Sequence, residues 1–360
     1  MSIIQLYPIL LERRIVEPIW GGQRLAKWLD LPEPQPTQLG ETWQVFDTNI
    51  ILNGVLAGQT LAQVTKQFGA DFIGTRTVAR YGIDFPLLAK FIDANDKLSI
   101  QVHPDDTYAH TYEAHTSFHG KTEAWYILEA TSDANVTYGL ERPSNRAEFT
   151  EAVEAGKLEP LLNHTSVRTG DVIFVPAKTL HAINEGIILF EIQQKSDLTY
   201  RVYDYGRLDA KTGQPRELHL EKALEVADFA PPPHAKIAPL PLDTDNSQIL
   251  LIACSLFALE RLTLLDQRVM STNPGTFEIL TVIEGSCTIT SSVDAVELRR
   301  GDSTVLPATL GGYILHSTHA DTPLQILRVY VPDLEKDFLQ PMRAQNLDEK
   351  RIAATVIHNL

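Results

Sequence analysis

The feature that most constrains the fold of this chain is a repeated stretch of eight residues. Residues 170–177 read GDVIFVPA, and residues 301–308 read GDSTVLPA. Each copy combines a glycine-aspartate turn, a short apolar strand and a proline that ends the strand. A similar apolar strand pair precedes each copy, starting at Glu123 and at Glu278. This duplication predicts a mainly β protein with two jelly-roll β-sandwich domains, a fold whose barrel-like pocket can host a metal.

Other segments depart from the β pattern and suggest where the domains divide. Residues 141–163 have helical spacing and predict a small helical insertion. Residues 231–241 are rich in proline and predict a linker, and residues 347–357 predict a closing helix. We therefore expect one domain over residues 1–230, which includes the insertion, and a second over residues 242–360.

One predicted strand, residues 99–103, carries polar side chains on one of its faces. Ser99, Gln101 and His103 alternate with two apolar residues, so the three polar side chains project together. Each polar group would need a partner if that face were buried. Taken alone, the pattern fits the outer face of an edge strand as well as it fits a functional site.

Four side chains from three predicted strands form a candidate metal site: Gln101, His103, Glu123 and His181. Two imidazoles, a carboxylate and an amide oxygen suit Zn²⁺ or another divalent first-row ion. With neutral histidines and one carboxylate, a bound ion keeps a net charge of about +1, as a Lewis acid requires. The second repeat keeps Glu278 but has Gly312 where the first has His181. Only the first domain is therefore predicted to hold a metal and to be catalytic.

Basic residues lie near this candidate site in the sequence. Lys121 is two residues before the candidate carboxylate, and Arg201 and Arg207 follow the apolar strand that contains Glu191. Surface salt bridges are the usual role of such residues. Together with the Ser99 hydroxyl, they can alternatively form an anion pocket.

A second group of histidines, His110, His115 and His119, lies within residues 107–120. Two of them, His115 and His119, are four residues apart. We interpret the segment as a solvated loop or the rim of a pocket in preference to a second metal site.

Composition excludes several classes of function. The net charge of −15 argues against binding to nucleic acid or to an anionic membrane surface. No apolar run approaches the roughly 18 residues of a membrane span. The two cysteines, Cys254 and Cys287, lack ligand-like spacing and fit buried thiols in a reducing, cytoplasmic protein.

Four stretches together resemble type I mannose-6-phosphate isomerase of the short bacterial form, a family of the cupin superfamily: residues 98–105, 120–126, 175–183 and 191–201. The resemblance implies two cupin domains, the second without a metal site. It also implies a zinc-dependent aldose–ketose isomerase, with one Zn²⁺ per chain, that interconverts mannose 6-phosphate and fructose 6-phosphate. The expected partner is a hexose 6-phosphate, and we expect a monomer or homodimer.

Carried over to this sequence, the resemblance makes the four candidate ligands the zinc ligands and Arg201 the active-site arginine. It assigns substrate or phosphate contacts to Ser99 and Lys121, and with them we place Arg207. Moving a carbonyl between C1 and C2 requires a base and a stabilised enediolate. Burial on an apolar strand makes Glu191 our candidate base, with orientation of Arg201 as its equally supported alternative. Arg201, Glu191 and Lys121 are thus the catalytic candidates.

Two other functions fit parts of the pattern. A cupin non-haem iron oxygenase uses two histidines and one carboxylate, although the amide ligand and the basic residues favour the isomerase. A non-catalytic regulator that binds a sugar phosphate is the alternative from another class. Metal analysis, oxygen uptake and turnover separate the three functions.

Overall fold

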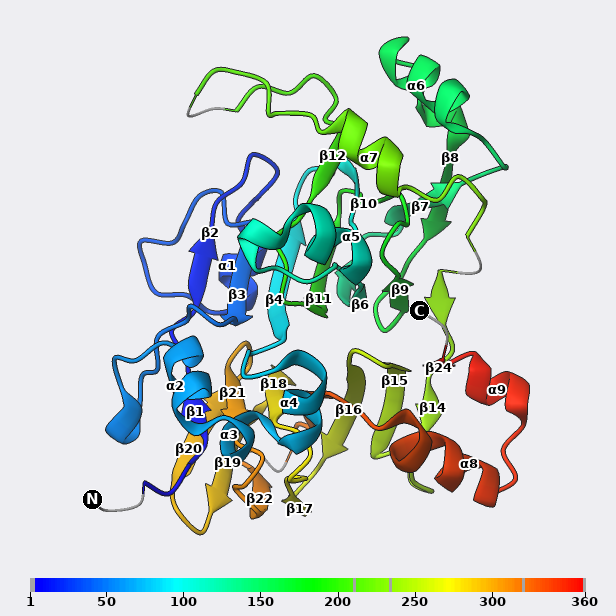
Figure 1. The fold of residues 1–360 in the computed structure, drawn as a ribbon. Helices are drawn as coiled ribbons and strands as arrows, with labels where there is room; N and C mark the ends of the chain where they lie inside the picture. The colour runs from blue at the N-terminus through cyan, green and yellow to red at the C-terminus, as the bar shows by residue number, and fades with distance from the viewer. Residues whose placement is uncertain (1–3, 210–211, 233–234, 319–320, 359–360) are drawn as a thin grey trace. The chain divides into compact units, whose positions relative to one another are not determined.

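The computed structural model describes residues 4–209, 212–232, 235–318 and 321–358 (Figure 1). Within these ranges the chain forms two compact units that alternate along the sequence. The central unit comprises Ile15–Thr42 and Lys90–Lys236, and the terminal unit comprises Met1–Arg14, Trp43–Ala89 and Ile237–Leu360. Each unit is described by itself below.

The central unit is built from two sheets. In spatial order the first, here the β6 sheet, contains β13 (Lys236–Ile237), β9 (Val172–Val175), β6 (Glu123–Ala130), β11 (Ile187–Gln194), β4 (Leu87–Ala94), β3 (Glu41–Val45) and β2 (Arg14–Val16). The second, the β5 sheet, contains β12 (Tyr200–Tyr203), β5 (Ile100–Val102), β10 (His181–Ile183), β7 (Asn135–Leu140) and β8 (Leu162–Ser166). Apolar side chains of both sheets join in one core, to which Trp125 of β6 and Tyr138 of β7 belong.

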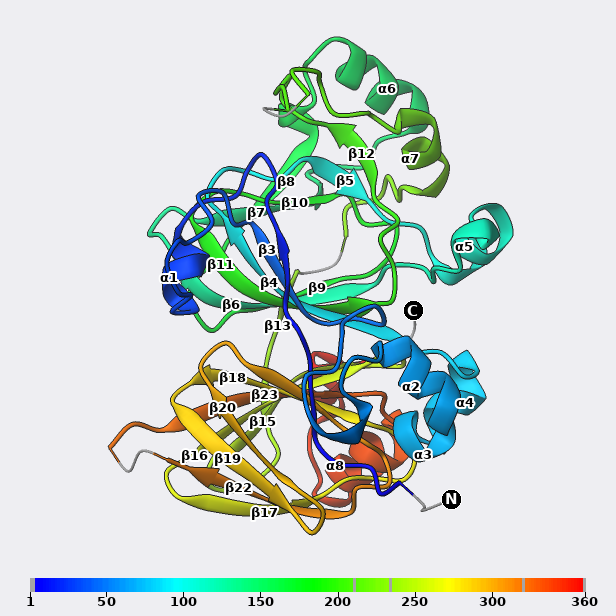
Figure 2. The ribbon, with the colours of Figure 1, turned by 90° about the vertical axis from the view of Figure 1, so that its left-hand side faces the viewer.

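Helices cover the other face of the β5 sheet, called its outer face below (Figure 2). Ile100 and Val102 of β5 pack there with Phe149 of α6 (Arg146–Glu154) and Leu224 of α7 (Leu220–Val226). Asn145 caps α6, because its side chain accepts a hydrogen bond from the backbone of Glu148. Helix α6 lies within residues 141–163, where the sequence predicts a helical insertion, and strand β8 begins before that range ends.

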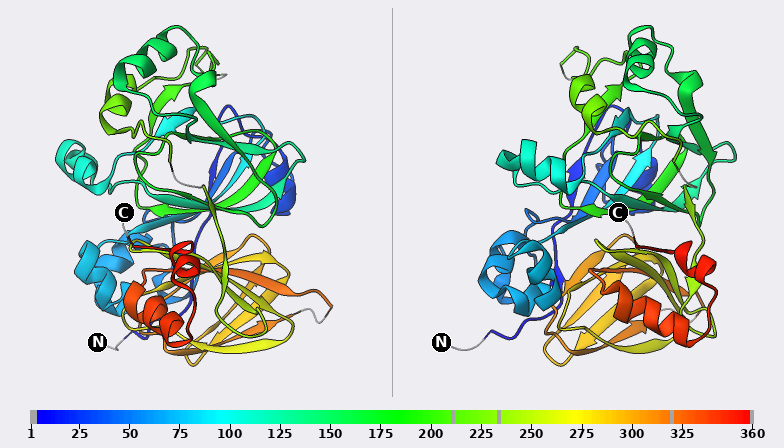
Figure 3. Two further views of the ribbon diagram at one scale, coloured as in Figure 1. Left: turned by 90° about the vertical axis from the view of Figure 1, so that its right-hand side faces the viewer. Right: turned by 45° about the vertical axis from the view of Figure 1, so that its right-hand side comes forward.

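The terminal unit is also a pair of sheets around a shared core (Figure 3). Its β18 sheet contains, in order, β1 (Ile9–Leu10), β21 (Ser303–Leu306), β18 (Glu278–Glu284), β23 (Leu324–Tyr330), β16 (Ala258–Leu264), β15 (Gln248–Cys254) and β14 (Leu240–Pro241), with β24 (Val356–Ile357) on β15. Its β19 sheet contains β17 (Gln267–Ser271), β22 (Gly312–Ser317), β19 (Ser286–Ser291) and β20 (Ala295–Arg299).

The repeat in the sequence is a repeat in the structure. Glu123 of β6 pairs with Val175 of β9, and Glu278 of β18 pairs with Leu306 of β21, so the two copies share one register. Gly170 and Gly301 both have φ of 89°, a left-handed conformation that favours glycine at the turn before each strand. The predicted duplication and mainly β fold are confirmed.

The two units do not follow the linear boundaries expected from the sequence. The segment between β3 and β4, residues 46–86, lies inside the predicted first domain but belongs to the terminal unit. The Phe85 ring packs against the Phe277 ring at 4.6 Å between centroids, and the Arg76 guanidinium donates to the Asp337 carboxylate at 2.9 Å. A domain boundary at residue 230 remains a prediction, and residues 233–234 of the predicted linker lie outside the described residues.

The remaining helices are short. They are α1 (Arg24–Trp28), α2 (Leu61–Phe68), α3 (Ala70–Ile73), α4 (Thr75–Tyr81), α5 (Asp106–Tyr112), α8 (Gln340–Ala344) and α9 (Glu349–Ala353), with single turns η1 (Gly54–Leu56), η2 (Ala114–Thr116), η3 (Glu159–Leu161) and η4 (Leu334–Leu339). The predicted closing helix over residues 347–357 is shorter than expected, because the chain leaves α9 and adds strand β24 to β15. Among the described residues, no helix has the length and apolar character needed to cross a membrane.

Candidate metal centre

Strand β5 presents its polar side chains to the inside of the central unit. Its apolar residues, Ile100 and Val102, belong to the outer core, so the alternation of a strand turns Gln101 inward. Gln101 pairs with His181 of β10 on one side and with Arg201 of β12 on the other. Directly opposed residues share a face, so these three side chains are neighbours on the inner face.

Three of the four predicted ligands converge there. The ligand atoms of His103, Glu123 and His181 all lie within 4.8 Å of one another, and all three side chains are buried. One carboxylate oxygen of Glu123 lies 3.5 Å from Nε2 of His103, and the other lies 3.3 Å from Nε2 of His181. Each oxygen thus faces one imidazole, and the carboxylate lies between the two rings.

Backbone carbonyls hold both imidazoles in the orientation that a metal needs. Nδ1 of His103 lies 2.9 Å from the Leu198 carbonyl oxygen, and Nδ1 of His181 lies 2.8 Å from that of Thr179. An Nδ1–H that donates to a carbonyl leaves the lone pair of Nε2 directed at Glu123. Fixing the tautomer and the ring angle in this way is typical of metal-ligating histidines.

The fourth predicted ligand, Gln101, lies beside the other three. Its Nε2 is 3.4 Å from Nε2 of His181. The two ends of an amide are assigned from the hydrogen-bond network, and rotation by half a turn exchanges oxygen for nitrogen. The Gln101 amide is therefore within reach of the triad, and its oxygen is the end that would bind a metal.

Lys121 completes this cluster, as its spacing from the carboxylate predicts. Its ammonium lies 2.9 Å from Oε2 of Glu123 and 3.0 Å from Nε2 of His103, and the residue is buried. A lysine at these distances supplies the positive charge that a buried carboxylate requires. It reaches the same ligand atoms that a divalent ion would use.

The electrostatics favour a neutral His103 and an ionised Glu123. Burial, followed by the Lys121 ammonium, lowers the pKa of His103 well below its usual value. Burial alone would raise the pKa of Glu123, but Lys121 and the two imidazoles outweigh it and lower that pKa well below the usual range. A neutral imidazole and an ionised carboxylate are the forms that bind metal.

Glu191 is buried in β11, a strand of the β6 sheet. It pairs with Trp125 in the ladder between β11 and β6, and the Trp125 indole donates to its Oε2 at 2.8 Å. The Lys90 ammonium lies 3.0 Å from its Oε1 and 3.3 Å from Glu41. Burial raises the pKa of the Glu191 carboxyl, and the charge of Glu123 raises it further against the pull of Lys90.

These contacts bear on the two roles expected for Glu191. Among the described residues, its bonded partners are Trp125 and Lys90, so the structure gives no direct contact through which it would orient Arg201. Trp125 and Lys90 were not singled out from the sequence. A charged lysine within an otherwise apolar buried strand was the signal that a buried ion pair lay there.

Arg201 and Ser99 come together as predicted. The Arg201 Nε donates to the Ser99 hydroxyl at 3.3 Å, and its Nη1 donates to the Glu217 carbonyl at 2.7 Å. The guanidinium is only partly buried, since Arg201 is of intermediate exposure. It therefore lies beside Gln101 with donors still available to a ligand.

Arg207 is held differently from the other basic candidates. Its guanidinium donates to the carboxylates of Asp96 at 3.0 Å and Asp204 at 2.7 Å and to the Lys97 carbonyl at 2.6 Å. Arg216 binds the same Asp204 carboxylate. These bonds use the guanidinium N–H groups that Arg207 would offer to a phosphate. They also connect Arg207 to the loop before β5.

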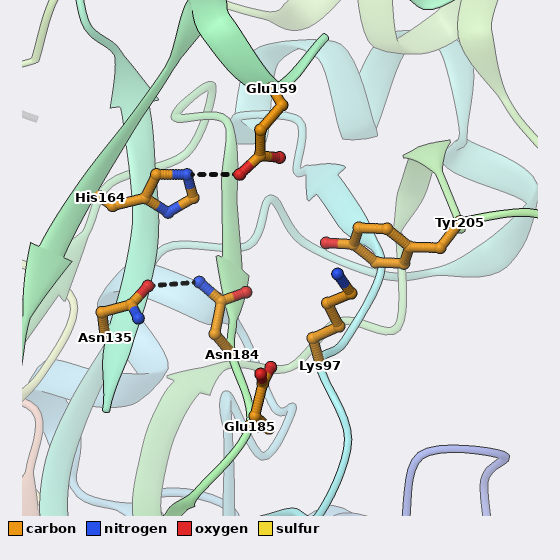
Figure 4. A pocket seen from close by; sticks show the side chains of 7 residues that line it. All are labelled: Lys97, Asn135, Glu159, His164, Asn184, Glu185 and Tyr205. Carbon is orange, nitrogen blue, oxygen red and sulfur yellow. Dashed lines mark hydrogen bonds and ion pairs between the residues drawn. The ribbon is translucent and has the colours of Figure 1, made fainter. Parts of the chain in front are cut away.

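A polar pocket of about 260 Å³ lies close to Arg207 on the outer face of the β5 sheet (Figure 4). The Arg207 guanidinium lies 5.1 Å from the ring centre of Tyr205, which lines this pocket with Lys97 and His164. His164 pairs with Thr137 of β7, whereas the neighbouring Tyr138 pairs with His181. Successive residues of a strand face opposite sides, so the pocket and the metal centre lie on opposite faces of the sheet.

Family models identify two regions of the chain. Residues 9–133 match the catalytic domain of type I phosphomannose isomerase, and residues 246–322 match the mannose-6-phosphate isomerase cupin domain. The mannose-6-phosphate isomerase of Streptococcus mutans is 34% identical over 308 residues, which cover 84% of this chain and 93% of that protein. The chain belongs to the type I mannose-6-phosphate isomerase family.

Other relatives extend this similarity to the three-dimensional structure. Mannose-6-phosphate isomerase ManA of Bacillus subtilis is 35% identical over 86% of this chain and 95% of its own length. A crystal structure of the mannose 6-phosphate isomerase from Bacillus subtilis has a TM-score of 0.78, with 31% identity over 90% of this chain and 99% of that one. The predicted family, the cupin fold and the classification as an isomerase are confirmed.

In the second copy of this isomerase, the counterpart of Glu123 has a different set of partners from that of the candidate metal centre. The carboxylate of Glu278, equivalent to Glu123, accepts from the Tyr313 hydroxyl at 2.7 Å and from the Arg328 guanidinium at 2.6 Å. Tyr313 directly follows Gly312, the counterpart of His181. A fixed guanidinium therefore supplies the positive charge at this carboxylate.

We expect Glu278→Gln to leave the metal content of the isomerase unchanged, because Glu278 is already paired with Arg328 and Tyr313. Elemental analysis of the purified variant against the wild type measures this. Loss of one stoichiometric ion on substitution of Glu278 would contradict the prediction that the second copy holds no metal.

Proposed function

We propose that this chain interconverts mannose 6-phosphate and fructose 6-phosphate through an enediolate, using one catalytic Zn²⁺ per chain. The chain matches nearly the whole length of relatives that are named mannose-6-phosphate isomerases. The observation that carries the proposal is the convergence of two imidazole Nε2 atoms on the Glu123 carboxylate, with each Nδ1 held by a backbone carbonyl.

We assign the zinc ligands as Gln101, His103, Glu123 and His181. When bound, the ion supplies a Lewis acid that polarises substrate oxygens. Neutral histidines and glutamine leave Glu123 as the one charged ligand, so the ion retains positive charge for that task. The amide ligand and the basic neighbours favour this assignment over an iron oxygenase.

We assign contacts with the substrate and with the developing negative charge to four other residues. Arg201 lies beside Gln101 on the inner face and presents a fork of donors to the oxyanion that develops at C1 or C2. Ser99, hydrogen-bonded to Arg201, and Lys121 contact the substrate or its phosphate. Lys121 is also a catalytic candidate, because its ammonium reaches the ligand atoms of the centre. Arg207 would reach a phosphate only by exchanging its aspartate partners.

Glu191 is the proposed base that removes the proton at C2 and returns it at C1. Burial and the charge of Glu123 raise the pKa of its carboxyl above the usual value, which makes the carboxylate a stronger base. The Trp125 indole and the Lys90 ammonium fix its position. A single base on one face of the enediolate can carry the proton in both directions.

We further propose that the protein acts in the cytoplasm on a soluble hexose 6-phosphate, as a monomer or homodimer. Both cysteines are free and buried, and burial raises the pKa of Cys254 to about 11 and that of Cys287 to about 12. Protonated, buried thiols fit a reducing compartment.

An isomerase assay with mannose 6-phosphate tests the proposal directly. Fructose 6-phosphate should form, turnover should stop after chelation, and zinc should restore it. Tight binding of mannose 6-phosphate without turnover in the metal-loaded protein would support the regulator instead, and consumption of oxygen would support the oxygenase.

We expect Ser99→Ala to weaken use of mannose 6-phosphate far more than any use of free mannose. A hydrogen bond to a charged group contributes roughly 1.5–3 kcal/mol, which is about a 10- to 150-fold loss in kcat/KM. Lys121→Ala should act in the same direction. Thr137→Val, which removes a hydroxyl from the outer face of the same sheet, is the matched control. Equal losses for both sugars would show that Ser99 and Lys121 do not contact the phosphate.

We expect Glu191→Gln to stop exchange of the C2 proton of mannose 6-phosphate with solvent, together with net isomerisation. NMR in heavy water follows the exchange. Glu41→Gln is the control, because it removes the other carboxylate on Lys90 and leaves the proposed base intact. Exchange that persists at a substantial rate in Glu191→Gln would transfer the role of base to another group, with Lys121 the first candidate.

A further inference from the structure

A second cluster of potential metal ligands lies outside the catalytic centre. The carboxylate of Asp106 and the imidazoles of His110 and His119 place one ligand atom each within 4.8 Å of the others. Nε2 of His110 and Nδ1 of His119 are 3.1 Å apart, and the two rings meet edge to face at 77°. His119 therefore pairs with His110, nine residues away, and His115 stays exposed outside the cluster.

The local fold brings these three residues together. Asp105 caps α5 by accepting from the backbone of Tyr108, so Asp106 and His110 stand four residues apart on one face of the helix. The chain then returns through η2, and the backbone N–H of His119 donates to the Lys195 carbonyl at 3.1 Å. This whole segment, which contains α5 and η2, lies in the sequence between two of the proposed catalytic ligands, His103 and Glu123.

The returning chain passes very close to the start of the helix. A Cβ at Gly120 would lie 2.5 Å from the backbone of Asp105 and Asp106, so only glycine fits there. Gly120 donates its N–H to Oδ1 of Asp106 at 2.8 Å, and the Gln194 amide donates to the same oxygen at 2.8 Å. These two bonds orient the Asp106 carboxylate, as the outer partners of metal-binding carboxylates do.

We propose that Asp106, His110 and His119 bind a second divalent transition-metal ion of the zinc class, separate from the catalytic ion. Two nitrogens bound at about 2.0–2.1 Å in a tetrahedral site lie roughly 3.4 Å apart, close to the separation of the two imidazole nitrogens here. Two imidazoles select such an ion over Ca²⁺ or Mg²⁺, which prefer oxygen ligands. With three protein ligands, the fourth position is open to water.

The position of this site gives the ion a structural role. The ion would link α5 to His119, which directly precedes Gly120 and lies two residues before Lys121. The Lys121 N–H donates to the Pro104 carbonyl at 2.9 Å, so the same part of the chain positions Lys121 and leads into β6, which begins at Glu123. The bound ion therefore stabilises the segment that leads into the catalytic centre without sharing a ligand with it.

Metal stoichiometry tests the inference. The full-length protein, equilibrated with micromolar Zn²⁺ and freed of excess metal, should hold two ions by elemental analysis. His119→Ala and His181→Ala should each hold one, and the double variant none. His115→Ala is the matched control, because it removes an exposed histidine of the same segment, and it should hold two. Since His181→Ala removes only the catalytic ion, failure of one site is distinguishable from failure of the other.

A second measurement guards against loss of fold in a variant. In His181→Ala, added Zn²⁺ should raise the melting temperature, because an ion that binds only the folded state stabilises it. That rise should disappear when His119→Ala is added and persist when His115→Ala is added. A single ion in the wild type under these conditions, or two ions in a folded His119→Ala protein, would overturn the proposal.

Discussion

The His181→Ala protein is expected to lose its catalytic metal and all detectable isomerase activity while remaining folded. His181 supplies one of two imidazoles that face the Glu123 carboxylate, and its ring is already fixed by the Thr179 carbonyl. A Lewis acid that contributes several kcal/mol to catalysis corresponds to a loss of roughly a thousand-fold or more. Steady-state kinetics, elemental analysis and circular dichroism of the same preparation measure the three effects.

The neighbouring His164→Ala protein provides the control. His164 is on the outer face of the same sheet, where it hydrogen-bonds Glu159 at 3.0 Å. It should keep both its catalytic metal and its turnover. Full activity in a His181→Ala protein shown to lack the catalytic ion would refute the ligand assignment.

The Arg328→Met protein is expected to be strongly destabilised. The Arg328 guanidinium donates to Glu260 at 3.1 Å and to Glu278 at 2.6 Å, and both carboxylates are buried. Removing it leaves two buried negative charges without their cation, which costs about 3–5 kcal/mol. The melting temperature should fall by roughly 10 °C, as differential scanning calorimetry would show.

Two further variants separate this charge effect from lost packing. Arg299→Met removes an exposed guanidinium that lies 4.0 Å from Asp302, and it should change stability little. Adding Glu278→Gln to Arg328→Met removes one of the stranded charges and should recover part of the loss. If the Arg328→Met and Arg299→Met proteins have the same melting temperature, the buried ion pairs of Arg328 do not stabilise the second copy.

The repeat and the polar face of one strand could be predicted because local pattern specifies them. A strand alternates its side chains, so the spacing of Ser99, Gln101 and His103 places all three on one face. The eight-residue repeat places Glu123 and Glu278 at equivalent ladder positions, and the structure keeps that register. Neither inference requires knowledge of which distant segments meet.

The parts that the sequence did not reveal depend on long-range pairing. The contacts of Glu191 with Trp125 and Lys90 join three separate strands, and no local spacing relates them. The pairing of His110 with His119 arises from the return of the chain through Gly120, whereas helical spacing draws attention to His115 and His119. Likewise, the sequence near Arg207 gives no indication that its guanidinium will donate to the Asp96 carboxylate.

The alternation of the two units along the chain has a consequence for how the protein is made. Residues 43–89 leave the ribosome early, but their packing partners in the terminal unit extend to β24 at Val356–Ile357. At 5–20 residues per second, the roughly 270 residues that follow take about 15–55 s to synthesise. During that time the apolar side chains of Phe72, Ile73 and Phe85, buried in the finished protein, have no completed core to enter. The nascent chain thus exposes these apolar side chains until its final strand emerges.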